Sequence, residues 1–131
     1  MRIYLDAAPV IYLVERVSPF FPKVQAMLAV SNAVLVASHL TRMECKVIPL
    51  RNHDALLTAG FDAYFADVVS EIVPLSGAVF DRAIEIRAFY GFSTPDSIHL
   101  AAATAHRCNV FLTNDRRLDR YSDLVIETIS E

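Results

Sequence analysis

The sequence predicts an α/β domain of three layers, in which helices cover both faces of a central, mainly parallel sheet of about five strands. Short apolar segments rich in β-branched residues alternate along the chain with longer segments of helical character. Parallel neighbours need such crossover segments, since a tight hairpin joins only antiparallel strands. The length of 131 residues suits one domain that buries its own core without disulfides or a structural metal. We therefore expect a single domain over residues 1–131.

Five segments have the composition of short strands. Each is mainly apolar, as expected in a sheet that is covered on both faces. The predicted strands are residues 2–5 (RIYL), 34–37 (VLVA), 71–75 (EIVPL), 110–113 (VFLT) and 124–127 (LVIE). In an open parallel sheet, ligands bind beyond the carboxyl ends of the strands, so residues that follow these segments are candidates for a site.

The stretches between the strands are predicted to be helical. Ser76 suits the N-cap of one helix and Gly91 its end. Pro19 and Pro22 bracket two phenylalanines and predict a turn between helices. The clearest helices are residues 21–31 (FPKVQAMLAVS), 54–69 (DALLTAGFDAYFADVV) and 76–91 (SGAVFDRAIEIRAFYG).

A further helix is predicted in the segment STPDSIHLAAATAHR. Thr94 suits its N-cap and Pro95 its first turn. The i, i+3, i+4, i+7 spacing of an apolar helix face is present at Ile98, Ala101, Ala102 and Ala105.

Composition argues against several classes of site. The three glycines form neither a G-x-G-x-x-G nor a Walker A sequence, so a glycine loop that cradles phosphates is not expected. The two cysteines, Cys45 and Cys108, form no C-x-x-C pair, which argues against a zinc ribbon and a disulfide framework. Asp6 interrupts the apolar amino-terminal stretch, and no run approaches the roughly 20 apolar residues of a membrane span. We expect a cytoplasmic protein in a reducing compartment, with no membrane partner.

Four acids are expected near one edge of the sheet. Asp6 follows the strand at residues 2–5, and Asp115 follows the strand at residues 110–113 after one intervening residue. Asp96 lies in the first turn of its helix, and Glu44 lies early in the helix after residues 34–37. Carboxylates packed together repel one another unless cations neutralise them. Hard oxygen ligands suit Mg²⁺ or Mn²⁺, and one or two such ions can activate water and stabilise a leaving oxygen in phosphodiester cleavage.

Each acid also has a simpler explanation. Asp96 is favoured at a helix start by the helix dipole alone. Glu44 lies three residues after Thr41 and can complete a capping box. Asp6 and Asp115 can be turn residues. Only the combination of the four favours a metal site.

Two arginines, Arg116 and Arg117, follow Asp115 directly. They can bind phosphates that approach a metal at the acids, or they can belong to a solvated helix start. Arg42 and Lys46 lie beside Glu44 in the sequence and are further candidates for substrate binding. The net charge of −3 argues against a nucleic-acid partner, but less so if several carboxylates hold metal ions.

Four segments together resemble the PIN domain, in particular the VapC-type toxins of toxin–antitoxin pairs. They are IYLDAAPVIYLVE, SHLTRMECKVIPLR, STPDSIHLAAATAH and VFLTNDRRL. The resemblance implies a metal-dependent endoribonuclease whose acidic centre is Asp6, Glu44, Asp96 and Asp115. Thr113 and Asn114 match the "TN" of the family, which implies that they position the last acid or a water. The resemblance also implies an RNA substrate, an antitoxin protein as partner and a homodimer.

One position departs from the family pattern. Where relatives usually carry Asn or Ser two residues after the first acid, this chain has Ala8. A non-catalytic PIN-fold binding module with an impaired metal site is therefore the main alternative, and a metal-dependent phosphatase that acts on small molecules is a weaker one.

The histidines form no H-E-x-x-H motif and no set with cysteines, so all four are assigned structural roles. They are His39, His53, His99 and His106. A Ser-His-Asp hydrolase is not expected either, because Gly-x-Ser-x-Gly is absent.

Overall fold

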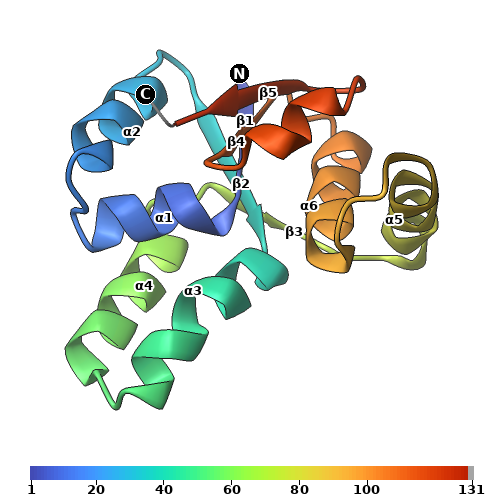
Figure 1. Cartoon of the computed structure of the whole chain (residues 1–131). Coiled ribbons are helices and arrows are strands. Elements are labelled where there is room, and N and C mark those ends of the chain that lie inside the picture. Colours follow the sequence, from blue (N-terminus) through green and yellow to red (C-terminus); the bar gives the residue numbers. More distant parts are fainter. Residues whose placement is uncertain (130–131) are drawn as a thin grey trace.

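The computed structural model describes residues 1–129, which form a five-stranded sheet with helices on both faces (Figure 1). Its strands are β1 (Arg2–Leu5), β2 (Val34–Ser38), β3 (Glu71–Val73), β4 (Val110–Thr113) and β5 (Val125–Thr128). They lie in the order β3-β2-β1-β4-β5, and each pairing among them is parallel. The predicted fold class is confirmed. The segment predicted at residues 71–75 ends earlier, at Val73, because Pro74 has no N–H to donate to a neighbouring strand.

The helices lie in two groups. Figure 1 shows α5 and α6 on one side of the sheet and α1 to α4 on the other. The bounds are α1 (Ala7–Val14), α2 (Phe20–Leu28), α3 (His39–Arg51), α4 (Ala55–Asp67), α5 (Gly77–Tyr90) and α6 (Thr94–Ala105). A 3-10 helix, η1 (Arg116–Arg120), follows β4.

Alternate residues of the central strands feed two apolar cores. Ile3 and Leu5 of β1 pack with Leu112 of β4 against the group of α1 to α4. Tyr4 points to the other face and stacks on Phe111 within the core under α5 and α6, with ring centroids 5.3 Å apart. This period of two is that of a strand, and both faces are apolar because both are covered.

The ends of α5 and α6 fix the segment that leads into the predicted site. Ser76 caps α5 by accepting from the Val79 N–H, and Gly91 ends it with a left-handed φ of 77°, both as predicted. The prediction that Thr94 caps the next helix is wrong. Ser93 is the N-cap and accepts from the Asp96 N–H, while Thr94 is the first helical residue.

The turn predicted around Pro19 and Pro22 is shorter than expected. Pro19 is the N-cap of α2, and Pro22 already lies in the first helical turn, where its missing N–H costs nothing.

Among the helices of the described part of the chain, none combines the length and the apolar character needed to cross a membrane.

Candidate metal centre

Asp6 stands at the carboxyl end of β1, where it is the N-cap of α1. Its Oδ1 accepts from the Ala7 N–H at 2.8 Å, and its Oδ2 accepts from the Thr113 hydroxyl at 2.8 Å. Its own backbone N–H donates to the Leu112 carbonyl at 3.1 Å. The carboxylate is therefore oriented by the first backbone N–H of α1 and by the hydroxyl of the last residue of β4.

Glu44 is not a cap of its own helix. α3 starts after Ser38, whose backbone N–H donates to the Thr41 hydroxyl at 3.4 Å. The Thr41 hydroxyl in turn donates to the Leu5 carbonyl at 3.2 Å, which ties the start of α3 to the end of β1. Glu44 follows in the next turn of α3, with its carboxylate 2.6 Å from the Nε2 of His99.

His99 joins the two acids from the core side. Its side chain is 1% exposed, and its Nε2 lies 2.6 Å from Glu44 Oε1 and 3.6 Å from Asp6 Oδ1. One potential ligand atom from each of these three residues lies within 4.8 Å of the others. The sequence alone indicated only a structural role for His99. The available signal was its position three residues after Asp96 on α6, which puts both residues on one helix face.

The environment of His99 shifts its basicity. Burial lowers the pKa of His99, but the hydrogen bond to Glu44 and the negative charges of Asp6 and Glu44 outweigh it. The net effect is a pKa above the usual value for histidine.

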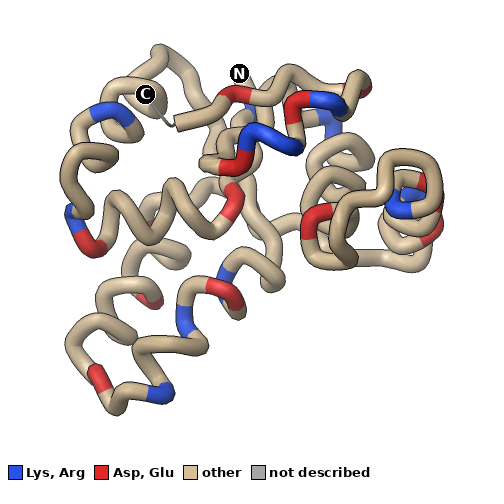
Figure 2. Tube along the Cα trace, viewed as in Figure 1, with Lys and Arg blue, Asp and Glu red and all other residues tan. Residues whose placement is uncertain are grey.

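Asp96 lies in the first turn of α6, half-buried. Burial raises the pKa of its carboxyl, a hydrogen bond with Ser93 opposes this, and the charges of Asp6 and Asp115 raise it further. The carboxylates of these three residues are thus close enough to repel one another. Figure 2 shows acidic positions at the start of α1, on α3 and on α6, with basic positions on the helical turn after β4.

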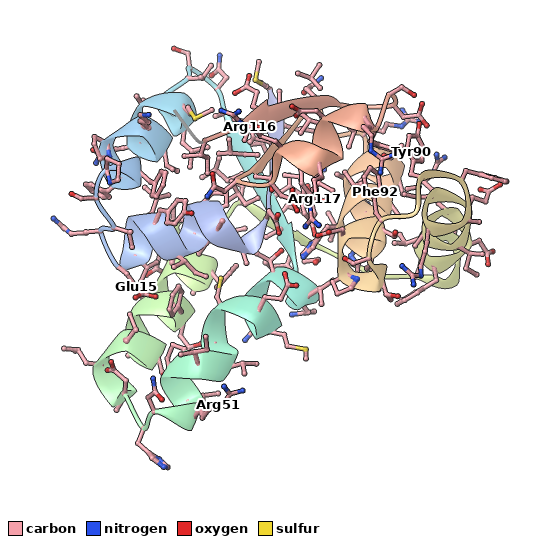
Figure 3. All side chains as sticks on the ribbon, viewed as in Figure 1. Glu15, Arg51, Tyr90, Phe92, Arg116 and Arg117 are labelled. Carbon is pink, nitrogen blue, oxygen red and sulfur yellow. The ribbon has the colours of Figure 1, made fainter. Side chains whose placement is uncertain are left out.

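Asp115 is already paired. It caps η1, and its two oxygens accept from Nε and Nη2 of Arg117 at 3.0 and 2.7 Å. This hydrogen-bonded pair lowers the pKa of Asp115 below its usual value. In Figure 3, Arg117 extends from η1 toward the start of α6, whereas Arg116 projects on the other side of the turn. The two predicted phosphate-binding arginines therefore differ in position.

The TN pair, Thr113 and Asn114, contacts Asp115, Asp6 and α1. Thr113 accepts from the Asp115 N–H at 3.1 Å but donates its hydroxyl to Asp6. Asn114 donates its side-chain amide to the Tyr12 hydroxyl on α1. Thr113 is thus an orienting group for the first acid, and Asn114 links β4 to α1.

The other predicted cations are bound to protein groups. Arg42 lies 2.9 Å from the Nδ1 of His39, and Lys46 pairs with Asp62 of α4 at 2.5 Å. A further arginine, Arg51, is the last residue of α3, and Figure 3 places it at that end of the helix.

The donor set fits a divalent cation. The oxygens of Asp6 and Glu44 converge within coordination range of each other, and Asp96 lies in their electrostatic field. Carboxylate oxygens are the preferred ligands of Mg²⁺ and Mn²⁺. A cation would also relieve the repulsion that raises the pKa of Asp96.

The family model described as PIN domain matches residues 3–124. A comparison with curated proteins finds no match.

Solved structures share the fold. The VapBC2 complex of Rickettsia felis, bound to a promoter DNA fragment, aligns with TM-score 0.79 and 16% identity over 98% of each chain. A toxin–antitoxin complex from Klebsiella pneumoniae aligns with a TM-score of 0.78 and 20% sequence identity over 98% of each chain. VapC20 of Mycobacterium tuberculosis, a Sarcin-Ricin loop cleaving toxin, aligns with a TM-score of 0.70 and 13% sequence identity. The alignment covers 83% of this chain and 86% of VapC20. At these identities the likeness concerns the fold alone.

Proposed function

The chain belongs to the PIN domain family, and we propose that it is an endoribonuclease that depends on Mg²⁺ or Mn²⁺, the toxin of a toxin–antitoxin pair. PIN domains are generally nucleases. One feature of the fold supports this function most strongly. Acids from four separate segments gather at one edge of a parallel sheet, where Asp6 and Glu44 converge and Asp96 feels the charges of Asp6 and Asp115.

Asp6, Glu44, Asp96 and Asp115 are the residues that would hold the cation. When bound, a divalent cation supplies Lewis acidity, which makes water a better nucleophile and stabilises charge on the leaving oxygen. The protein orients the ligands. The Thr113 hydroxyl and the Ala7 N–H fix the Asp6 carboxylate before any ion arrives, so little freedom is lost on binding.

Arg117 has two competing roles in this function. Its guanidinium donates to both oxygens of Asp115, so a cation at Asp115 would have to share those oxygens with Arg117 or displace it. The side chain of Arg117 is 81% exposed and, once released, can meet two phosphate oxygens with its planar fork. We assign it to the RNA backbone, with Arg116 as a second candidate.

Lys46 and Arg42 are weaker candidates for substrate binding. Lys46 would have to leave Asp62, and Arg42 would have to leave His39. Arg42 lines a hollow on the surface of α3 together with Met43 and Lys46, close in sequence to Glu44. Both side chains are less exposed than that of Arg117, and they therefore rank below it for contact with phosphates.

Two exposed apolar faces support protein partners. One face lies on α3 and includes the exposed side chains of Met43, Ile48 and Leu50. The other lies on α5 and includes those of Phe80, Ile84 and Phe89. Several similar structures are complexes of a toxin with its antitoxin. An antitoxin and a second copy of this chain are therefore the partners that we propose. A clean monomer in light scattering at every concentration would contradict the homodimer.

The alternative of a binding module rests on Ala8, which offers no hydroxyl or amide to bind a water at the metal. In the structure a side-chain donor to Asp6 is Thr113, on β4. The orientation of the Asp6 carboxylate therefore does not depend on position 8, which supports the enzyme, and the cleavage assay decides between the two.

The test is incubation of the protein with a structured RNA, with DNA of the same sequence and with a phosphomonoester, in Mn²⁺, Mg²⁺ or EDTA. We expect RNA cleavage that needs the metal, that Asp6→Asn abolishes and that Asp119→Asn preserves. Asp119 is an exposed acid of η1 and a matched control, because the charge change is the same. RNA binding without cleavage would support the binding module, and faster hydrolysis of the phosphomonoester would support a phosphatase.

A further inference from the structure

A chain of hydrogen bonds runs from the core to the acids. The Tyr4 hydroxyl lies 2.9 Å from the Ser38 hydroxyl and 2.8 Å from the Nδ1 of His99. The Nε2 of His99 then reaches Glu44 at 2.6 Å, with Asp6 at 3.6 Å. Tyr4, Ser38 and His99 are all 1% exposed or less, so the chain is shielded from solvent until it meets the carboxylates.

The contact with Glu44 decides where the ring proton lies. An ionised carboxylate can only accept hydrogen bonds, so Nε2 must carry the proton in the 2.6 Å contact. The Tyr4 hydroxyl is compatible with either state of Nδ1. It donates to a bare Nδ1, or it accepts from a protonated Nδ1 and donates to Ser38. For as long as the contact with an ionised Glu44 is kept, Nε2 carries a proton in both cases and offers no lone pair to a metal.

We infer that His99 is a positioning residue, not a metal ligand: held by Tyr4, which Ser38 in turn anchors, it orients the carboxylate of Glu44 toward a divalent cation shared with Asp6. This inference rests on the proposed metal-dependent function. Groups that hydrogen-bond to metal ligands fix their geometry, and losing them typically costs about 10- to 100-fold in metal affinity. A purely structural histidine would leave metal affinity unchanged in a folded variant.

Three substitutions separate the contributions. His99→Leu removes the donor, His99→Gln keeps a side-chain N–H, and Tyr4→Phe keeps the ring of His99 but removes its anchor. His106→Gln is the control, since His106 ends the same helix and contacts the Pro74 carbonyl, away from the acids. Mn²⁺ affinity is measured by electron paramagnetic resonance at pH 8 without RNA, and melting in EDTA verifies that each variant folds.

We expect His99→Leu to bind Mn²⁺ at least about tenfold more weakly than the wild type. His99→Gln should recover most of the lost affinity. The Mn²⁺ affinity of Tyr4→Phe should lie between those of the two His99 variants. His106→Gln should match the wild type. Pulsed measurements on the wild type should show no nitrogen bonded directly to Mn²⁺. If His99→Leu does not fold, Tyr4→Phe and His99→Gln still test the inference.

Several outcomes would overturn it. Direct nitrogen coupling that disappears in His99→Gln would make His99 a ligand. Unchanged or tighter Mn²⁺ binding by folded His99→Leu would show that the ring does not orient a metal ligand. Failure of the wild type to bind Mn²⁺ would also overturn the inference, because there would be no metal site for the ring to organise. If the wild type binds Mn²⁺ with the expected order of variants but leaves RNA intact, the positioning role stands and the nuclease proposal fails.

Discussion

At the scale of single residues, the Asp6 carboxylate is held by donors from two directions. Ala7 donates its backbone N–H to Oδ1, and Thr113 donates its hydroxyl to Oδ2. Thr113 is fully buried, and its hydroxyl also accepts from the Asp115 N–H. One side chain thus couples the first and last acids of the proposed centre.

Thr113→Val keeps the shape of the side chain and removes this hydroxyl. The Asp6 Oδ2 and the Asp115 N–H then lose a partner, and we expect a loss of about 1–3 kcal/mol in the free energy of unfolding. Mn²⁺ affinity should fall as well, because Asp6 is no longer fixed. Denaturant unfolding and Mn²⁺ titration measure the two effects. Thr128→Val is the control. Within residues 1–129, the Thr128 side chain hydrogen-bonds to Asp119, which is not a proposed metal ligand. Unaltered Mn²⁺ affinity in Thr113→Val would show that this contact does not orient a metal ligand.

Arg117→Ala removes the cation that occupies Asp115. We expect tighter Mn²⁺ binding, since a positive charge beside the proposed metal ligands is removed. RNA binding should weaken and lose part of its salt dependence, because fewer counterions are released from the phosphates. Arg82→Ala, on α5, makes the same change of charge elsewhere. A salt series of RNA affinity beside a Mn²⁺ titration tests both effects, and an unchanged salt slope would move the phosphate-binding role to Arg116, Arg42 or Lys46.

Asp96→Asn should abolish cleavage without destabilising the metal-free fold. The folded-state pKa of Asp96 is raised, chiefly by burial and also by Asp6 and Asp115. Its contribution to stability is therefore complete below the unfolded value of about 4 and is lost as pH rises through the folded pKa. In EDTA near pH 7, Asp96→Asn should melt at or above the wild type, and the difference should shrink as pH falls toward about 4. A large drop in melting temperature at pH 7 would instead indicate a structural role.

At the scale of elements, the short segment between α5 and α6 sets the position of Asp96. Gly91 ends α5 in the left-handed region, and Ser93 caps α6 through the Asp96 N–H. A helix N-terminus also favours the negative charge of Asp96. The acid is thus positioned by the start of its helix more than by the sheet.

Ser93→Ala and Ser76→Ala remove the same kind of cap from neighbouring helices. Each should cost about 0.5–2 kcal/mol in the free energy of unfolding. Only Ser93→Ala should also weaken Mn²⁺ binding, since only its helix carries a proposed ligand. Equal Mn²⁺ affinities for the two variants, measured with both folded, would show that the cap does not position Asp96.

The sequence predicts most elements because their signals are local. Strands such as residues 110–113 are continuous apolar runs, and Ser76 and Gly91 bound α5 as a capping serine and a terminal glycine should. The choice between Ser93 and Thr94 as a cap could not be made, because both residue types are good caps and only the backbone distinguishes them. His99 could not be assigned either. Its partners Glu44 and Tyr4 lie 55 and 95 residues away, so no spacing motif records the contact.

At the scale of the whole molecule, the parallel sheet is what brings distant acids together. β1 and β4 are neighbours although more than a hundred residues separate Asp6 from Asp115, and β2 lies on the other side of β1 and leads into α3. Because parallel strands end at one edge, the approach of Asp6 and Glu44 to each other could be predicted from the order of elements, and Asp115 was expected at the same edge. The ion pair of Arg117 with Asp115 could not, since it depends on the path of the chain through η1.

In the proposed function, RNA cleavage depends on the same cation that these acids would hold. The most direct test compares the Mn²⁺ dependence of RNA cleavage with Mn²⁺ binding measured on the same protein, for the wild type and Glu44→Gln. We predict that one Mn²⁺ concentration half-saturates binding and gives half-maximal cleavage in the wild type, and that Glu44→Gln shifts both together by about tenfold or more. Cleavage that persists in EDTA, or that follows a Mn²⁺ site which Glu44→Gln leaves unchanged, would contradict the claim.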